Sequence, residues 1–258
     1  MKKKMYVLGV AALVAALLAM SGVAQSAMWV GAEIGGNYNM GVNMSLDTAG
    51  FGTTRNTSIQ PSVIGGVTIG YDFVNAGFGA YAWPDWMKYF SFAMDLTYNR
   101  LTAHQGSGIF QNVADKSRVN GYELAWTFLF MAHYGFMPDS EVPGGRINPY
   151  IGVGPAIVWT GIDYKVAAAT PNRLNAPGAA GVLLDASVGN VGSSAMNVAL
   201  VVEPGIRWMC FKNVSVDTAM RYRYSVPSWN FDAFHTNITL KANPLHQLAF
   251  LVRANYHF

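Results

Sequence analysis

Apolar and polar side chains alternate along eight stretches of this chain. In the last stretch, "HQLAFLVRANYHF", apolar residues recur at every second position, with Gln247, Arg253 and Asn255 between them. Alternation with a period of two puts successive side chains on opposite faces of a β-strand. The stretches that carry it are residues 29–40, 62–73, 89–99, 121–134, 149–159, 197–210, 213–225 and 246–258. The pattern therefore predicts eight strands, each with one apolar and one polar face.

The two faces differ in size as well as in charge. The apolar face carries bulky and often aromatic residues, whereas glycines such as Gly31, Gly66 and Gly152 lie on the polar face. Small residues suit a narrow interior and large apolar residues suit lipid. This arrangement predicts a transmembrane β-barrel with an apolar outside and a polar inside.

Every charged residue of the eight predicted strand cores lies on the polar face. They are Glu33, Asp72, Asp95, Glu123, Glu203, Arg207, Asp217, Arg221, Arg223 and Arg253. An Arg or Lys facing lipid at the midplane costs about 2–4 kcal/mol, so ten such charges would exceed the stability of a domain, about 5–15 kcal/mol. An eight-stranded barrel is filled by its own side chains, and buried charges need partners. We therefore expect these residues to form an ion-paired network in the lumen, in preference to a conducting or catalytic role.

The first residues have the pattern of a secretory signal peptide. Three lysines precede the apolar run "MYVLGVAALVAALLAM", and the small residues of "SGVAQSA" follow. We expect a signal peptide over residues 1–26, with cleavage after Ser26 or Ala27, and a barrel domain over residues 27–258. A retained membrane anchor is disfavoured because the apolar run is short for a span. Cys210 is the single cysteine, so no internal disulfide and no lipid anchor are expected.

The connections between the predicted strands differ in length. Residues 41–62, 101–121, 161–196 and 225–246 form long polar connections, whereas 211–213 is very short and 135–147 moderate. Long external loops and short periplasmic turns are typical of outer-membrane barrels. The segment 74–89 is long for a turn, so either it lies along the membrane interface or the strand ends differ there. Two further strands are expected if "TNITLKA" pairs, and Pro155 and Pro204 predict bulges or local breaks.

Several motifs resemble a known family. "NPYIGVGPAI", "EPGIRW", "VSVDTAMRYRYS" and the closing "VRANYHF" are similar to the small outer-membrane β-barrels that include the OmpA transmembrane domain, OmpX and the opacity-type proteins. The resemblance implies one eight-stranded antiparallel up-and-down barrel in the outer membrane of a Gram-negative bacterium, surrounded by lipid and lipopolysaccharide. It also implies that Phe258, with Tyr256, forms the signal read by the barrel-assembly machinery.

Candidate chemistry is sparse. The chain contains no GxSxG, HExxH, Walker A or CxxC motif, and none of its five histidines fits the His-x-Ser pattern of lipid A deacylases. The nearest nucleophile–base–acid set is His104, Ser107 and Asp115 in a glycine-rich loop. "SLDTAG" and "NVADKS" hold possible calcium ligands, but not at EF-hand spacing. We expect no cofactor and no metal.

These observations favour a non-enzymatic function. The interpretation we prefer is an integral outer-membrane barrel, monomeric, that supports membrane integrity and makes surface contacts through its loops. The alternative is a narrow pore or an OmpW-like conduit for small hydrophobic molecules, and a third reading is a lipid A-modifying enzyme. A net charge of +3, with no basic run beyond the first four residues, gives no support for nucleic-acid binding.

Overall fold

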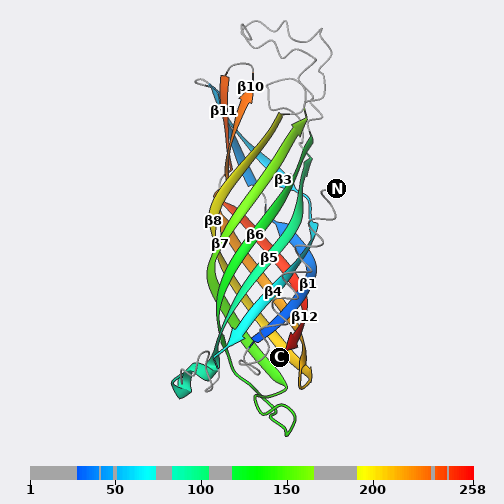
Figure 1. Cartoon of the computed structure of the whole chain (residues 1–258). Helices are drawn as coiled ribbons and strands as arrows, with labels where there is room; N and C mark the ends of the chain where they lie inside the picture. Colours follow the sequence, from blue (N-terminus) through cyan, green and yellow to red (C-terminus); the bar gives the residue numbers. More distant parts are fainter. Residues whose placement is uncertain are drawn as a thin grey trace, which may run out of the picture.

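Eight antiparallel strands close into a barrel (Figure 1). The computed structural model describes residues 28–40, 42–48, 51–73, 83–104, 118–165, 191–233, 236–242 and 244–258. The barrel strands are β1 (Met28–Asn39), β4 (Ser62–Asp72), β5 (Phe90–His104), β6 (Arg118–His133), β7 (Ile147–Lys165), β8 (Val191–Phe211), β9 (Val214–Ser225) and β12 (Leu245–His257). Each pairs with its neighbour in that order, and β12 pairs with β1 to close the ring. The predicted eight-stranded antiparallel barrel is confirmed.

Both ends of the described chain lie at one end of the barrel. The backbone N–H of Phe258 donates to the carbonyl of Met28 at 3.0 Å, next to the tight β8–β9 turn at residues 212–213. We call this the turn end and the opposite end the loop end. The signal peptide predicted over residues 1–26 lies outside the described residues.

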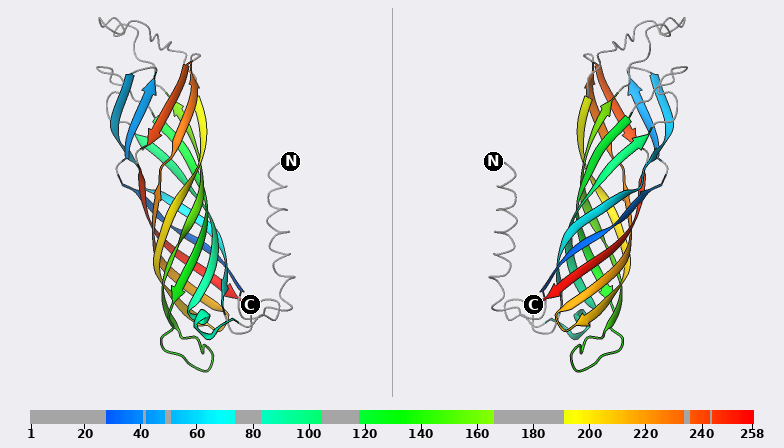
Figure 2. Two further views of the ribbon diagram at one scale, coloured as in Figure 1. Left: turned by 90° about the vertical axis from the view of Figure 1, so that its left-hand side faces the viewer. Right: turned by 90° about the vertical axis from the view of Figure 1, so that its right-hand side faces the viewer.

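Four additional strands extend the sheet beyond the barrel at the loop end (Figure 2). They are β2 (Val42–Thr48), β3 (Phe51–Ile59), β10 (Ser228–Ala233) and β11 (Thr236–Ala242). The segment "TNITLKA" is β11, and it pairs with β10 and β2. It therefore forms a strand, but it does not enter the barrel wall, which keeps eight strands.

The strands are longer than the alternation pattern predicted. β7 has 19 residues and β8 has 21, whereas a tilted strand needs only about 9–11 residues to cross a bilayer. The predicted long loops at 41–62, 161–196 and 225–246 are therefore partly wrong, because β2, β3, β10 and the outer ends of β7 and β8 occupy parts of them. Apolar alternation is required only where lipid surrounds the strand, so it does not report strand that continues beyond the membrane.

The two prolines interrupt the hydrogen-bonded ladder without shifting its register. Between β6 and β7 the pairing stops after Thr127↔Ala156 and resumes at Phe130↔Val153, on either side of Pro155. Between β8 and β9 it stops at Val202↔Tyr222 and resumes at Gly205↔Ala219, around Pro204. The expected local breaks are confirmed, since proline has no N–H to donate.

The outer surface of the barrel is apolar. Val63 and Val198 are each 71% exposed, Ile34 is 62% exposed and Phe250 59%. A continuous exposed apolar belt of this extent is unstable in water and stable in lipid. No helix in the described part of the chain is long and apolar enough to cross a bilayer.

The interior holds two large aromatic side chains that the size argument did not predict. Trp29 is fully buried in the lumen and lies over Gly70, its pairing partner on β4. Tyr150 lies in the same way over Gly205 of β8. A Cβ added to Gly70 would fall 2.1 Å from the Trp29 ring, so glycine provides the space that each aromatic ring occupies.

Candidate functional site

Two arginines and three carboxylates cross the middle of the lumen. Arg221 lies 3.5 Å from Glu33 and 2.5 Å from Glu203, and it also pairs with Asp95. Arg253 lies 2.6 Å from Glu33, 3.2 Å from Glu203 and 3.5 Å from Asp95. These residues come from β1, β5, β8, β9 and β12, and none is more than 5% exposed. The cluster therefore ties five of the eight barrel strands together across the interior.

The cluster continues toward the turn end. Arg253 lies 3.6 Å from Asp217, which pairs with Arg207 at 3.2 Å, and Arg207 lies 3.5 Å from Asp72. The Arg207 guanidinium stacks over the ring of Trp29 at 4.5 Å, and the indole N–H of Trp29 donates to Asp72 at 3.2 Å. Eight ionisable side chains thus form one connected network from the middle of the lumen to the turn end.

A second group lies toward the loop end. Arg223 pairs with Glu123 at 2.5 Å, and the Gln247 amide donates to Glu123 and to Asn39, both at 2.9 Å. Among the described residues, no ion pair joins this group to the central cluster. It closes the lumen at a second level with the same chemistry.

The structure puts all ten predicted lumen residues inside the barrel and gives each a partner of opposite charge. Sequence reasoning did not identify Trp29 and Tyr150 as part of the site. The Tyr150 hydroxyl donates to Glu203 at 3.2 Å. The signal for both was the glycine opposite each aromatic residue, but it becomes visible only when the strand register is known.

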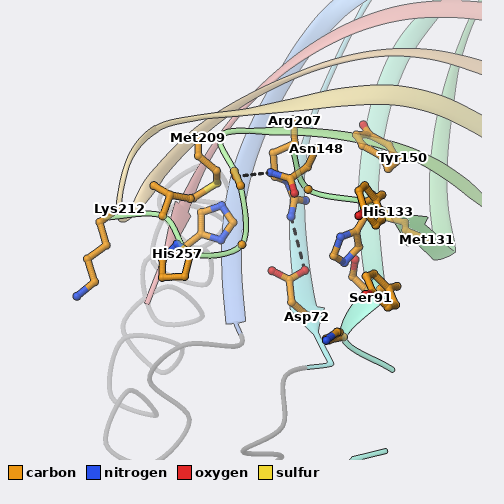
Figure 3. Close-up of a pocket in the computed structure, with 18 of the residues that line it drawn as sticks. Asp72, Ser91, Met131, His133, Asn148, Tyr150, Arg207, Met209, Lys212 and His257 are labelled. Carbon is orange, nitrogen blue, oxygen red and sulfur yellow. Dashed lines mark hydrogen bonds and ion pairs between the residues drawn. The ribbon is translucent and has the colours of Figure 1, made fainter. Parts of the chain in front are cut away.

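A cavity of about 1190 Å³ lies at the turn end, below the network (Figure 3). Asp72, Lys88, His133, Arg207 and Lys212 are among the residues that line it. Three buried polar atoms at this cavity, Ser91 Oγ, His133 Nε2 and Arg207 Nη2, have no hydrogen-bond partner within the described ranges. The three residues line the cavity, so its wall is polar in part.

An exposed ion-paired cluster lies in the β6–β7 turn. The Arg146 guanidinium pairs with Asp139 and, at 3.0 Å, with Glu141. Asp139 Oδ1 also accepts backbone N–H bonds from Val142 at 2.8 Å and from Glu141 at 2.9 Å. The Val142 N–H, followed by the Arg146 side chain, holds the pKa of Asp139 below its usual value. The acid therefore acts as an anchor for the turn.

The remaining predicted residues fall at the edges of the described structure. Tyr256 is 49% exposed on the outer face of β12, and its ring contacts that of Phe258 at 5.3 Å. His104 ends β5, but Ser107 and Asp115 lie outside the described residues, so the predicted trio is untested. The "NVADKS" calcium segment and the end of "SLDTAG" also lie outside them. In the part of the chain that the structure covers, no cluster of three or more His, Cys, Asp or Glu residues is arranged to hold a metal.

Solved structures with the same architecture exist, although no protein-family model and no curated protein matches the chain. The outer membrane protein OprG from Pseudomonas aeruginosa is 12% identical, with a TM-score of 0.57 over 92% of this chain and 98% of OprG. The outer membrane protein AlkL, solved by solid-state NMR in DMPC bilayers, is 15% identical, with a TM-score of 0.49 over 92% of each chain. Neisserial surface protein A is 9% identical, with a TM-score of 0.41 over 90% of this chain and 97% of its own.

The likeness to OprG supports the fold assignment. Together with the closed ring of eight antiparallel strands and the apolar outer belt, it defines the fold of a small membrane-spanning β-barrel, as found in outer-membrane proteins. The predicted resemblance to that family is confirmed at the level of the fold.

Proposed function

We propose that this protein is a closed outer-membrane barrel that supports the membrane and displays the sheet of β2, β3, β10 and β11 outside the cell. The observation that carries the proposal is the central cluster of Arg221 and Arg253 with Glu33, Asp95 and Glu203. These side chains are almost completely buried and meet across the lumen. A barrel whose cross-section is filled in this way is a scaffold with no open ion path.

Single-channel conductance tests the closed lumen. Purified protein in planar bilayers should give no steady conductance, whereas the double variant Arg221→Ala and Arg253→Ala, which removes both cations from the lumen, should conduct ions. Heat-modifiable gel migration would verify that the variant is folded. Stable, reproducible conductance steps from the unaltered protein would overturn the closed-scaffold proposal.

A deletion strain tests the membrane and surface roles separately. Loss of the protein should increase sensitivity to detergent, and the full-length protein should restore resistance. A variant with β2 and β3 replaced by a short turn should restore resistance equally, because the barrel below is intact, while losing any surface contact that the sheet makes. Detergent sensitivity equal to that of the parent strain would contradict a role in membrane integrity.

The cavity at the turn end favours a second candidate function, passage of small molecules. It would provide the periplasmic entrance of such a path, and the ion-paired cluster would be the barrier above it. Uptake of a small hydrophobic solute by vesicles that contain the protein, at a rate above that of empty vesicles, would support this candidate. Uptake that requires the double arginine variant would instead support the closed scaffold.

The proposal includes export and assembly as a monomer. Residues 1–26 would be removed as a signal peptide, and the barrel-assembly machinery would read Phe258 and Tyr256. Deleting Phe258 should lower the yield of folded barrel in the outer membrane, whereas Val226→Ala, a change at an exposed residue far from the terminus, should not. Unchanged yield after deletion of Phe258 would contradict this role. Intact mass of the mature protein tests the cleavage site.

A further inference from the structure

A short helix at the turn end carries aromatic side chains that the described part of the chain leaves partly exposed. Helix η2 (Asp85–Tyr89) has the sequence DWMKY and lies to the side of the barrel, beyond the wall (Figure 1). None of its residues is buried; Trp86 is 59% exposed and Tyr89 40%. Large exposed apolar groups gathered in one place indicate an interaction surface.

This surface is continuous with the lipid-facing belt of the barrel. The Trp86 ring contacts Phe90 edge-to-face at 5.8 Å, and Phe90 stacks on Phe130 at 5.3 Å. Phe130 lies on the outer face of β6 and is 45% exposed. An unbroken series of aromatic rings therefore leads from the membrane-embedded wall out to the helix.

A parallel series of contacts joins the helix to the β6–β7 turn. The Tyr89 ring stacks on Tyr134 at 5.8 Å, and Tyr134 contacts Phe136 at 5.1 Å. Tyr134 and Phe136 are 54% and 50% exposed, and Met137 beside them is 69% exposed. Helix and turn thus present one apolar surface at the same end of the barrel.

The polar groups of this surface suit the edge of a bilayer better than its centre. The Lys88 ammonium lies 5.3 Å above the Tyr89 ring, and Asp85 begins the helix. Trp and Tyr are enriched at the lipid headgroup level because one part of each ring is apolar and the other forms hydrogen bonds. A lysine at this level keeps its stem against apolar groups and its charge in water.

We propose that η2 is inserted in the headgroup region of the adjacent leaflet, where Trp86 and Tyr89 contact phospholipid. The helix then acts as a lateral membrane anchor that fixes the depth of the barrel on the β5–β6 side. Its occupant is the bilayer itself, since the surface continues the lipid-facing belt and carries the residue types of an interface.

Site-directed labelling in vesicles tests this anchor. In a Cys210→Ser background, a bimane fluorophore is attached at Trp86→Cys, and the protein is reconstituted in phosphatidylcholine with bromine near the headgroup or near the bilayer centre. The label should be quenched more strongly by bromine near the headgroup than by bromine at the centre, and only weakly by iodide in water. Val252→Cys on the barrel wall should show the opposite bromine preference, and Lys212→Cys in the β8–β9 turn should respond to iodide alone.

A label at Tyr89→Cys leaves Trp86 in place and provides a second position. It should show the same headgroup preference as the label at position 86. Quenching by iodide alone at either position, as at Lys212, would overturn the proposal, because the helix would then stand in water.

Discussion

The same chemical unit, an arginine between carboxylates, occurs in two surroundings in this molecule. In the lumen, Arg221 joins Glu203 and Asp95 with its side chain 1% exposed. In the β6–β7 turn, Arg146 joins Asp139 and Glu141 with its side chain 35% exposed. The contacts are alike, but the first cluster is buried and the second is open to solvent. We infer that burial, and not the number of contacts, decides how much each cluster contributes to the stability of the barrel.

Removal of Arg221 should give the largest effect. The Arg221→Ala variant leaves Glu33, Asp95 and Glu203 buried with Arg253 as their remaining cation, and breaking a buried pair costs about 3–5 kcal/mol. Urea unfolding in detergent would measure the loss of free energy of unfolding. Arg146→Ala is the matched control, and it should leave barrel stability unchanged because water replaces the lost contacts. Equal losses in the two variants would remove the distinction between the clusters.

A charge placed on the outer face should be the next most damaging change. Phe250 is 59% exposed near the middle of β12, where an arginine would face lipid. Phe250→Arg should destabilise the barrel in vesicles by about 2–4 kcal/mol, whereas Phe250→Leu should have little effect. If the arginine were tolerated as well as leucine, the outer face would not be in contact with lipid.

Filling the space beneath Trp29 should reduce the stability of the barrel by a smaller amount. Gly70→Ala would bring a methyl group to 2.1 Å from the indole ring and displace it from Arg207, at a cost of about 1–3 kcal/mol. Gly36→Ala is the control, because a Cβ there meets nothing within 4 Å. Thermal unfolding followed by tryptophan circular dichroism would separate the two variants. Identical unfolding midpoints would show that the position of the Trp29 ring does not depend on Gly70.

The smallest effect should come from acidification of the exposed turn. The pKa of Asp139 is lowered in the folded turn, so its contribution is complete above the usual aspartate value of about 3.9 and is lost as the pH falls through the lowered pKa. The amide chemical shift of Val142 should therefore be constant from neutral pH to about pH 5 and change only in strong acid. Asp139→Asn should abolish that change. A transition at neutral pH would contradict the assigned anchor.

The alternation of side chains was sufficient to predict the barrel wall and to place the ten charged residues of its strands on the inner face. Each charged residue of the predicted strands could be placed inside, because a charged side chain that faces lipid destabilises the barrel, whereas in the lumen it can pair with an opposite charge. Lipid outside and polar groups inside impose one physical asymmetry, and it is present in the sequence of each of the eight barrel strands.

The strands beyond the barrel and the aromatic residues of the lumen could not be predicted from alternation. β3, "FGTTRNTSI", is mostly polar and lacks apolar alternation, since it lies beyond the barrel where lipid imposes no pattern. β2, "VNMSLDT", does alternate at Val42, Met44 and Leu46, but the pattern spans only seven residues within a segment predicted as a loop. Trp29 and Tyr150 could not be assigned to the lumen, because their positions depend on Gly70 and Gly205 in neighbouring strands. Pairing partners such as Gln247 with Asn39 are likewise set by strand register, which the chain does not state locally.

The accessibility of β12 to oxygen tests most directly whether one face of the barrel wall meets lipid while the other face is enclosed. Nitroxide labels placed one at a time from Gln247 to Tyr256, in a Cys210→Ser background in vesicles, would report collisions with oxygen, which concentrates in the bilayer. A lipid-facing outer wall should give high accessibility at Leu248, Phe250, Val252, Ala254 and Tyr256 and low accessibility at the positions between them. The opposite alternation, or uniform accessibility along the strand, would contradict it.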